Sequence, residues 1–150
     1  MKRYLGGNSM GSMTLVLASV LFTSSISVQA NDPSFVAVAT DGVAFIQWTE
    51  SSGRLSGQYQ ALSVNEYDPL RLDNVNAAFS GVRSGPAVTL TFSGFLSSTT
   101  VTGTLEGGTL TLVVPNANGL LVKYVFKAGS VDDYNRAAQA LRKRVERQAT

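Results

Sequence analysis

Short apolar segments that alternate at every second position constrain the fold of this chain more than any other feature. The clearest case is residues 87–93 (AVTLTFS), where Val88, Leu90 and Phe92 point to one side and the threonines and serine point to the other. This spacing is typical of a strand with one buried face. The same period recurs through residues 34–127, with turn signals between the segments. The pattern therefore predicts an all-β domain.

Seven turn signals separate eight of these segments. Gly107-Gly108 suits the left-handed dihedral angles of a type I′ hairpin. Because nearly all the connections are of hairpin length, neighbours in sequence should be neighbours in the sheet. Closing the sheet removes its exposed edges, so we predict an eight-stranded antiparallel up-and-down barrel or curled meander. The predicted strands are centred near Phe35, Phe45, Tyr59, Ala78, Leu90, Thr102, Leu112 and Tyr124.

A C-terminal helix is predicted after the last strand. Ser130 and Asp133 have the spacing of a capping box, with Asp in place of the usual Glu, and residues 131–148 contain neither Gly nor Pro. We assign residues 31–129 to the barrel and residues 130–150 to an amphipathic helix of the same domain. Its apolar stripe consists of Val131, Tyr134, Ala138, Leu141 and Val145.

Two predicted strands, residues 43–48 and 120–126, carry apolar side chains on both faces. In a closed barrel both lie beside the first strand, and their outer faces need a cover. The helix is the only amphipathic element that can supply it. We therefore expect the helix to fold over the outside of the barrel, with its stripe near Phe45 and near Leu121 or Val125.

The interior of the barrel is predicted to be filled. Small inward residues at Gly57, Ala77 and Gly103 leave room for a small apolar ligand, but strands of six to eight residues favour a packed interior. The predicted core side chains are Trp48, Leu55, Tyr59, Phe79, Leu90, Phe92, Leu105, Leu112 and Phe126.

An eight-stranded meander barrel with an outer C-terminal helix resembles the lipocalin-like barrels in architecture. That family's short motif places a glycine two residues before a tryptophan on an early strand, whereas Ile46 occupies this position before Trp48. No ligand residue is therefore carried over from the family. What the resemblance implies is a carrier of a small apolar ligand, for which Trp48, Tyr59 and Phe92 are the candidate contacts.

The first thirty residues have the three parts of a secretory signal. They begin with two basic residues, continue with the apolar run MTLVLASVLF at 13–22, and end in Val-Gln-Ala at 28–30. The run is too short for a bilayer core about 30 Å thick, so a permanent membrane span is not expected. We predict a bacterial-type signal peptide over residues 1–30, cleaved after Ala30, and a secreted or extracytoplasmic protein; an uncleaved anchor is the alternative.

Charge and composition exclude several functions. The chain has 12 Lys and Arg residues and 10 Asp and Glu residues. Losing the two basic residues of the signal leaves 10 against 10, so no cationic surplus favours nucleic acid. Without cysteine or histidine, the chain cannot form disulfides, thiol nucleophiles, histidine-dependent triads or His/Cys metal sites. A non-enzymatic monomer without a cofactor is expected.

Carboxylates are the remaining groups that could support chemistry. A glycan hydrolase needs two carboxylates about 5 to 10 Å apart, and two of Glu50, Glu66 and Glu106 could supply them. Glu50 and Glu106 adjoin predicted turns, however, where a solvated side chain is favoured. The longest connection adds Asp68 and Asp73 to Glu66, which offers oxygen ligands for calcium. The spacing fits no known calcium loop, and a solvated loop is favoured.

The basic end of the helix offers a surface for a partner of the cell envelope. Three interpretations stay open: an exported binding or structural module, which we favour, a carrier of a small apolar ligand, and a carboxylate-dependent glycan hydrolase. The candidate partner-binding residues are Arg142, Lys143, Arg144 and Arg147.

Overall fold

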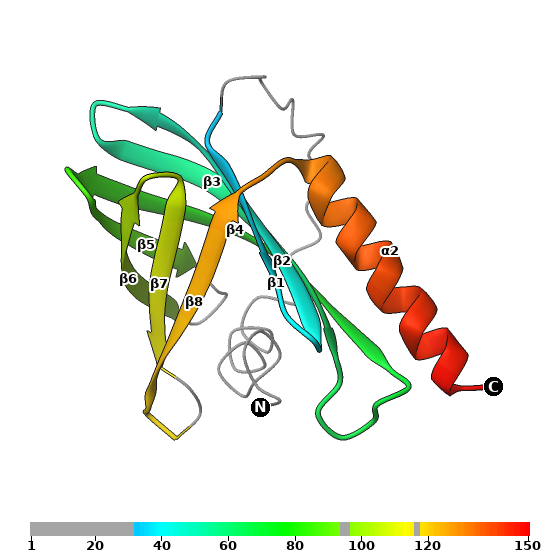
Figure 1. Ribbon diagram of the computed structural model, residues 1–150. Helices are drawn as coiled ribbons and strands as arrows, with labels where there is room; N and C mark the ends of the chain where they lie inside the picture. Colours follow the sequence, from blue (N-terminus) through cyan, green and yellow to red (C-terminus); the bar gives the residue numbers. More distant parts are fainter. Residues whose placement is uncertain (1–31, 94–96, 116–117) are drawn as a thin grey trace.

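Eight antiparallel strands form a closed barrel, and one helix follows them, in the part of the chain that the computed structural model describes: residues 32–93, 97–115 and 118–150 (Figure 1). The predicted signal peptide lies outside the described residues. The elements are β1 (Ser34–Val38), β2 (Gly42–Ser51), β3 (Arg54–Val64), β4 (Leu72–Ser84), β5 (Ala87–Ser93), β6 (Ser98–Glu106), β7 (Thr109–Pro115), β8 (Leu121–Ala128) and α2 (Val131–Gln148).

The strand order confirms the predicted meander. Each strand pairs with the next along the chain, and β8 returns to pair with β1. Gly107 and Gly108 join β6 to β7 with φ angles of 56° and 75°, the left-handed conformation expected at this hairpin. The architecture is thus a closed up-and-down barrel of the lipocalin-like kind, as the alternation and the short links predict.

The inward-facing side chains form one continuous core, and the nine predicted core residues all belong to it, Leu105 as a partly buried member. Aromatic rings cross the interior in a chain. The Trp48 ring lies 5.1 Å from Phe35 and 6.4 Å from Phe79, and Phe79 lies 5.4 Å from Phe92. Such contacts add to the area that the rings bury.

The small residues inside the barrel do not leave a large void. Gly57 pairs with Trp48 in the β2–β3 register. A Cβ atom at Gly57 would lie 2.5 Å from the Phe79 ring, so this glycine lets the two aromatic side chains approach each other. At Gly103 the Leu112 side chain occupies the corresponding space, 2.9 Å from where a Cβ would stand. The prediction of a packed interior is confirmed at these two positions.

The helix covers the outer face of β1 and β2. Tyr134 lies with its ring 5.9 Å from that of Phe45, so the predicted cover over Phe45 is confirmed. Among the described residues, no helix is both long enough and apolar enough to cross a membrane. The packing of the helix on the barrel forms a second core cluster, which consists of Val36, Val43, Phe45 and Leu62 of the barrel with Tyr134, Ala138 and Leu141 of the helix.

The predicted cover over β8 is wrong. Leu121 is 72% exposed and Val125 is 50% exposed. The helix begins three residues after β8 ends and crosses β1 to reach β2 (Figure 1). The outer face of β1 and β2 is the more apolar choice, because on β8 the outward positions alternate between apolar side chains and the lysines Lys123 and Lys127.

The N-terminus of the helix is capped as the sequence predicts. The Ser130 hydroxyl accepts from the Asp133 amide at 3.2 Å, and the Asp133 carboxylate accepts from the Ser130 amide at 2.8 Å. These hydrogen bonds, with a smaller contribution from Arg136, hold the pKa of Asp133 below its ordinary value near 3.8. The negative charge of Asp133 also interacts favourably with the helix dipole.

We expect Ser130→Ala to lower the free energy of unfolding by about 1 kcal/mol. Asp133→Asn should destabilise the protein at neutral pH and less so at pH 3. The folded pKa is depressed, so the carboxylate stabilises above its ordinary pKa and loses this effect as the pH falls through the folded value. Urea unfolding at both pH values measures this. Asp132→Asn is the control, and an equal pH dependence in both variants would contradict the capping role.

Candidate functional site

The two ends of the barrel differ. At one end, which we name the loop end, β1, β3, β5 and β7 finish and β2, β4, β6 and β8 begin (Figure 1). At the opposite end, tight turns join β2 to β3, β4 to β5 and β6 to β7. Long connections and exposed side chains at one end of a barrel are the usual place for recognition.

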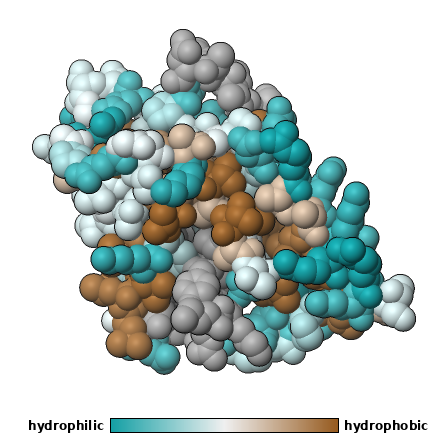
Figure 2. Space-filling view, viewed as in Figure 1, coloured by the Kyte–Doolittle hydropathy of each residue, from teal (hydrophilic) through white to brown (hydrophobic). Residues whose placement is uncertain are grey.

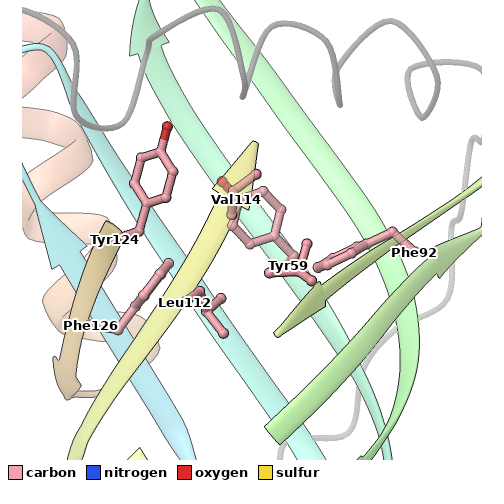
Figure 3. Close-up of a pocket in the computed structure, with 7 residues that line it drawn as sticks. Tyr59, Phe92, Leu112, Val114, Tyr124 and Phe126 are labelled. Carbon is pink, nitrogen blue, oxygen red and sulfur yellow. The ribbon is translucent and has the colours of Figure 1, made fainter. Parts of the chain in front are cut away.

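A small apolar cavity lies in the half of the barrel nearer the loop end (Figure 3). Its volume is about 20 Å³, which is room for about one water molecule or methyl group. The two tyrosine hydroxyls are the only polar side-chain groups among the residues that line it. These residues are Tyr59, Phe92, Val101, Leu112, Val114, Tyr124 and Phe126.

Two of the three predicted ligand contacts meet in this cavity. Tyr59 and Phe92 pack edge to face, with ring centroids 5.9 Å apart and planes at 79°. Burial, with smaller contributions from Tyr124 and Tyr134, raises the pKa of Tyr59 far above its ordinary range. Its phenol therefore stays neutral and serves as a wall of the cavity rather than as an acid or base.

Trp48, the third predicted contact, lies elsewhere in the interior. It is 1% exposed and packs between Phe35 and Phe79. Its indole Nε1 is buried and has no hydrogen-bond acceptor among the described residues. On the barrel surface, Trp48 also borders a polar depression of about 220 Å³, where Gln47 and Gln58 are neighbours. The structure thus separates Trp48 from the apolar cavity.

Strand parity also gives a signal for the cavity residues that were not predicted as ligand contacts, two of which, Leu112 and Phe126, were predicted as core side chains. Tyr124 and Phe126 alternate with outward residues on β8, as Val114 does on β7 and Val101 on β6. Figure 3 shows the two β8 aromatic side chains beside Leu112 and Val114. The alternation along each strand indicates that these side chains face inward. Which of them border a gap depends on the register and on how the neighbouring rings pack.

The seam between β1 and β8 is the least continuous part of the barrel. Only two residue pairs join these strands in the described chain, Phe35 with Ala128 and Val36 with Lys127. The other seven strand pairs share five to eleven residue pairs each. The seam is held at the end away from the loops, where the Ser34 hydroxyl donates to the Gly129 carbonyl at 2.7 Å and the Gly129 amide donates to the Ser34 carbonyl at 3.1 Å.

Exposed apolar side chains gather at the loop end. Of the seven large apolar residues that are exposed in the described chain, five lie at this end, while Val125 lies along β8 and Val82 near the opposite end. Figure 2 shows hydrophobic side chains over β8 and its loop end, at the lower left of the view. The five lie at three of the four strand connections of this end, where exposed apolar side chains can contribute to a contact surface. The five residues are Val38, Tyr67, Leu70, Leu120 and Leu121.

The four helix residues predicted to bind a partner do not form one free patch. Arg144 donates to the Thr40 carbonyl in the β1–β2 turn, so it fixes the end of the helix to the barrel. Burial raises the pKa of the neighbouring Asp41, and a hydrogen bond to the Asp41 backbone and the Arg144 charge only partly offset this. Arg142, Lys143 and Arg147 are exposed, and the Arg147 Nε donates to the Lys143 carbonyl at 3.3 Å.

The predicted carboxylate candidates are spread over both ends of the barrel. Glu50 forms an ion pair with Arg83 at 3.3 Å beside the β2–β3 turn. Glu106 precedes the β6–β7 turn at that same end, whereas Glu66 lies in the β3–β4 connection at the loop end. Glu66 therefore cannot pair with either of the other two. The ion pair with Arg83 gives Glu50 a structural role.

Polar side chains of the β3–β4 connection form hydrogen bonds within the connection and with its flanking residues. Asn65 Oδ1 accepts from the amides of Tyr67 and Asp68, and Asp68 Oδ1 accepts from the Leu70 amide at 3.0 Å. Asp73 accepts from the Asn65 side chain at 2.8 Å and pairs with Arg71 at 3.3 Å. In the described ranges, no three Asp or Glu residues come together as a metal site would require.

No protein-family model matches the sequence, and no curated protein or solved structure shows significant similarity to it.

Proposed function

We propose that the protein is an exported, non-enzymatic binding protein whose barrel receives the apolar part of a small ligand at the loop end. The observation that carries this proposal is the coincidence of two features at one end of the barrel. The apolar cavity lies in this half, and five exposed apolar side chains lie around its end. Binding sites combine a mostly apolar pocket with accessible apolar surface.

Export is supported by the predicted signal peptide, and a non-catalytic role is supported by the residues of the cavity. Its walls carry no charged residue type, and burial raises the pKa of the Tyr59 phenol, which therefore stays neutral. The chain also lacks histidine and cysteine. Such a site can bind an apolar group through area burial, at about 25 cal/mol per Å², but offers no general base or nucleophile at neutral pH.

The small volume sets the character of the binding. A cavity of about 20 Å³ accepts no more than a methyl-sized group without movement of its walls. A larger ligand must displace side chains that close the cavity. Phe92, Val114 and Tyr124 lie in the parts of β5, β7 and β8 nearer the loop end, so they are the side chains that must move.

Opposite substitutions at Val114 test the proposal with a neutral fluorescent probe, N-phenyl-1-naphthylamine. We expect Val114→Phe, which fills the cavity, to weaken probe binding about tenfold, and Val114→Ala, which enlarges it, to strengthen binding about threefold, since each buried CH₂ contributes about 0.8 kcal/mol. Fluorescence titration measures both. Val88→Ala is the matched control, because Val88 is also buried, 1% exposed against 6% for Val114, but does not line the cavity.

Circular dichroism and the unfolding midpoint establish that each variant is folded before binding is compared. Equal affinity of the probe for the unchanged protein and both Val114 variants would contradict a site in this cavity. If Val88→Ala changes the affinity of the probe and the Val114 variants do not, the site lies elsewhere in the core.

A further inference from the structure

We infer that the ligand is an anionic amphiphile with a single alkyl chain, which enters through the seam between β1 and β8 and leaves its head group at Lys123. This inference rests on the proposed function, because it concerns the same cavity. It adds the class of ligand, the route of entry and the residue that recognises the charge.

In this inference the part of the seam that lacks strand pairing is the entrance to the cavity. Residues 121–126 of β8 lie beyond the two residue pairs that join β8 to β1. Within this stretch Tyr124 and Phe126 form part of the cavity wall. This part of the cavity wall thus lies on the segment of β8 that, in the described chain, has its strand register with β7 alone. Moving this segment outward enlarges the cavity without breaking the pairing of β1 with β2.

The outer surface along the seam suits an amphiphile. Val38 of β1 is 67% exposed, and Leu121 and Val125 of β8 are also exposed. Val38 and Val125 would form a strand pair if the β1–β8 register continued for two more residues. Exposed valines on either side of this unpaired part of the seam are unfavourable in water, and an alkyl chain lying along it would shield them.

The charge on this surface is positive. The segment from Thr109 to Ala128 carries two lysines and no acidic residue. Lys127 donates to the Thr109 hydroxyl at 3.1 Å. Lys123 lies between Leu121 and Val125 on the outer face, and no acidic side chain of the described residues forms an ion pair with it. Its ammonium group is therefore available to a carboxylate or phosphate outside the cavity.

The ligand class follows from combining these features. The cavity has no charged or amide side chain, so it cannot receive a polar head group without a large desolvation penalty. The head group must stay outside, and the cation beside the seam selects a negative one. A single flexible alkyl chain fits a narrow space that opens sideways more readily than a rigid ring system does.

The test compares dodecanoate with dodecanol as competitors of the bound neutral probe. We expect Lys123→Glu to weaken dodecanoate binding about fivefold at low salt and to leave dodecanol unchanged, since an exposed ion pair contributes modestly and is screened by salt. Lys127→Glu is the matched control: it lies on the same face of the same strand, within the paired part of the seam. Equal loss in the two variants would overturn the role of Lys123.

Two further outcomes separate this inference from the proposed function. If Val114→Phe weakens binding of the probe but dodecanoate never displaces the probe, the cavity binds apolar groups and the ligand class is wrong. If Val114→Phe leaves the affinity of the probe unchanged, the proposed function itself fails. Vesicles of phosphatidylglycerol test the number of chains, because this lipid carries two: binding to them that depends on Lys123 would overturn a single-chain ligand, and binding of free dodecanoate alone would support it.

Discussion

Ending the chain after Gly129, so that α2 is absent, is expected to abolish folding to a stable barrel. The helix covers Val36, Val43, Phe45 and Leu62 on the outer face of the barrel. Burying such side chains contributes about 1.5 to 3 kcal/mol each, as an upper bound, so the loss of about 6 to 12 kcal/mol matches the whole stability of a typical domain. Circular dichroism and binding of a hydrophobic dye measure the result.

A point substitution tests the same packing with less disruption. Leu141→Ala should lower the free energy of unfolding by about 2 to 5 kcal/mol, because Leu141 is 3% exposed in the helix interface. Arg142→Ala, one residue further and exposed, should change the free energy of unfolding by less than about 0.5 kcal/mol.

For the truncation itself, a shortened chain that stays soluble, with the unfolding midpoint of the full chain, would show that the barrel does not need the helix as its cover.

The second large effect is expected at Trp48. Trp48→Ala removes a side chain that is 1% exposed and joins Phe35 to Phe79, so it should cost about 3 to 5 kcal/mol of stability. Trp48→Phe should cost much less than this. Phenylalanine keeps most of the ring packing, and it removes an indole N–H that is buried without an acceptor, which by itself costs about 1 to 3 kcal/mol.

Urea unfolding of the three proteins measures the difference between the two substitutions. Leu121→Ala provides the control for loss of an apolar side chain at the surface, where a change within about 0.5 kcal/mol is expected. If Trp48→Phe were as damaging as Trp48→Ala, the indole nitrogen would have to make an interaction that the structure does not contain.

The sequence predicts the elements of this fold well, because each depends on local chemistry. Period-two alternation gives the strands, paired glycines give the β6–β7 hairpin, and Ser130 with Asp133 gives the start of the helix. These signals act over a few residues and compete with little else. The end of the helix at Gln148 is also as predicted.

The direction of the helix and the site depend on non-local geometry, which the sequence shows less well. Both β2 and β8 carry apolar outward side chains, and in the sequence only the lysines of β8, Lys123 and Lys127, distinguish the face that α2 leaves open from the face that it covers. Parity shows that Tyr59 and Phe92 face inward, but only the register shows that they border the cavity while Trp48 packs against Phe79 across Gly57. The short pairing of β1 with β8 has no local signal at all.

The hydrogen bonds between Ser34 and Gly129 have a consequence for the order in which the chain assembles. They join positions 95 residues apart in sequence. Contacts of such separation carry a high entropy of loop closure and form slowly compared with hairpins. β1 is the first strand of the barrel along the chain, yet its second neighbour is the last strand and its outer cover is α2. The earliest strand is therefore the last to be completed, and the six hairpin links between β2 and β8 can form before it is.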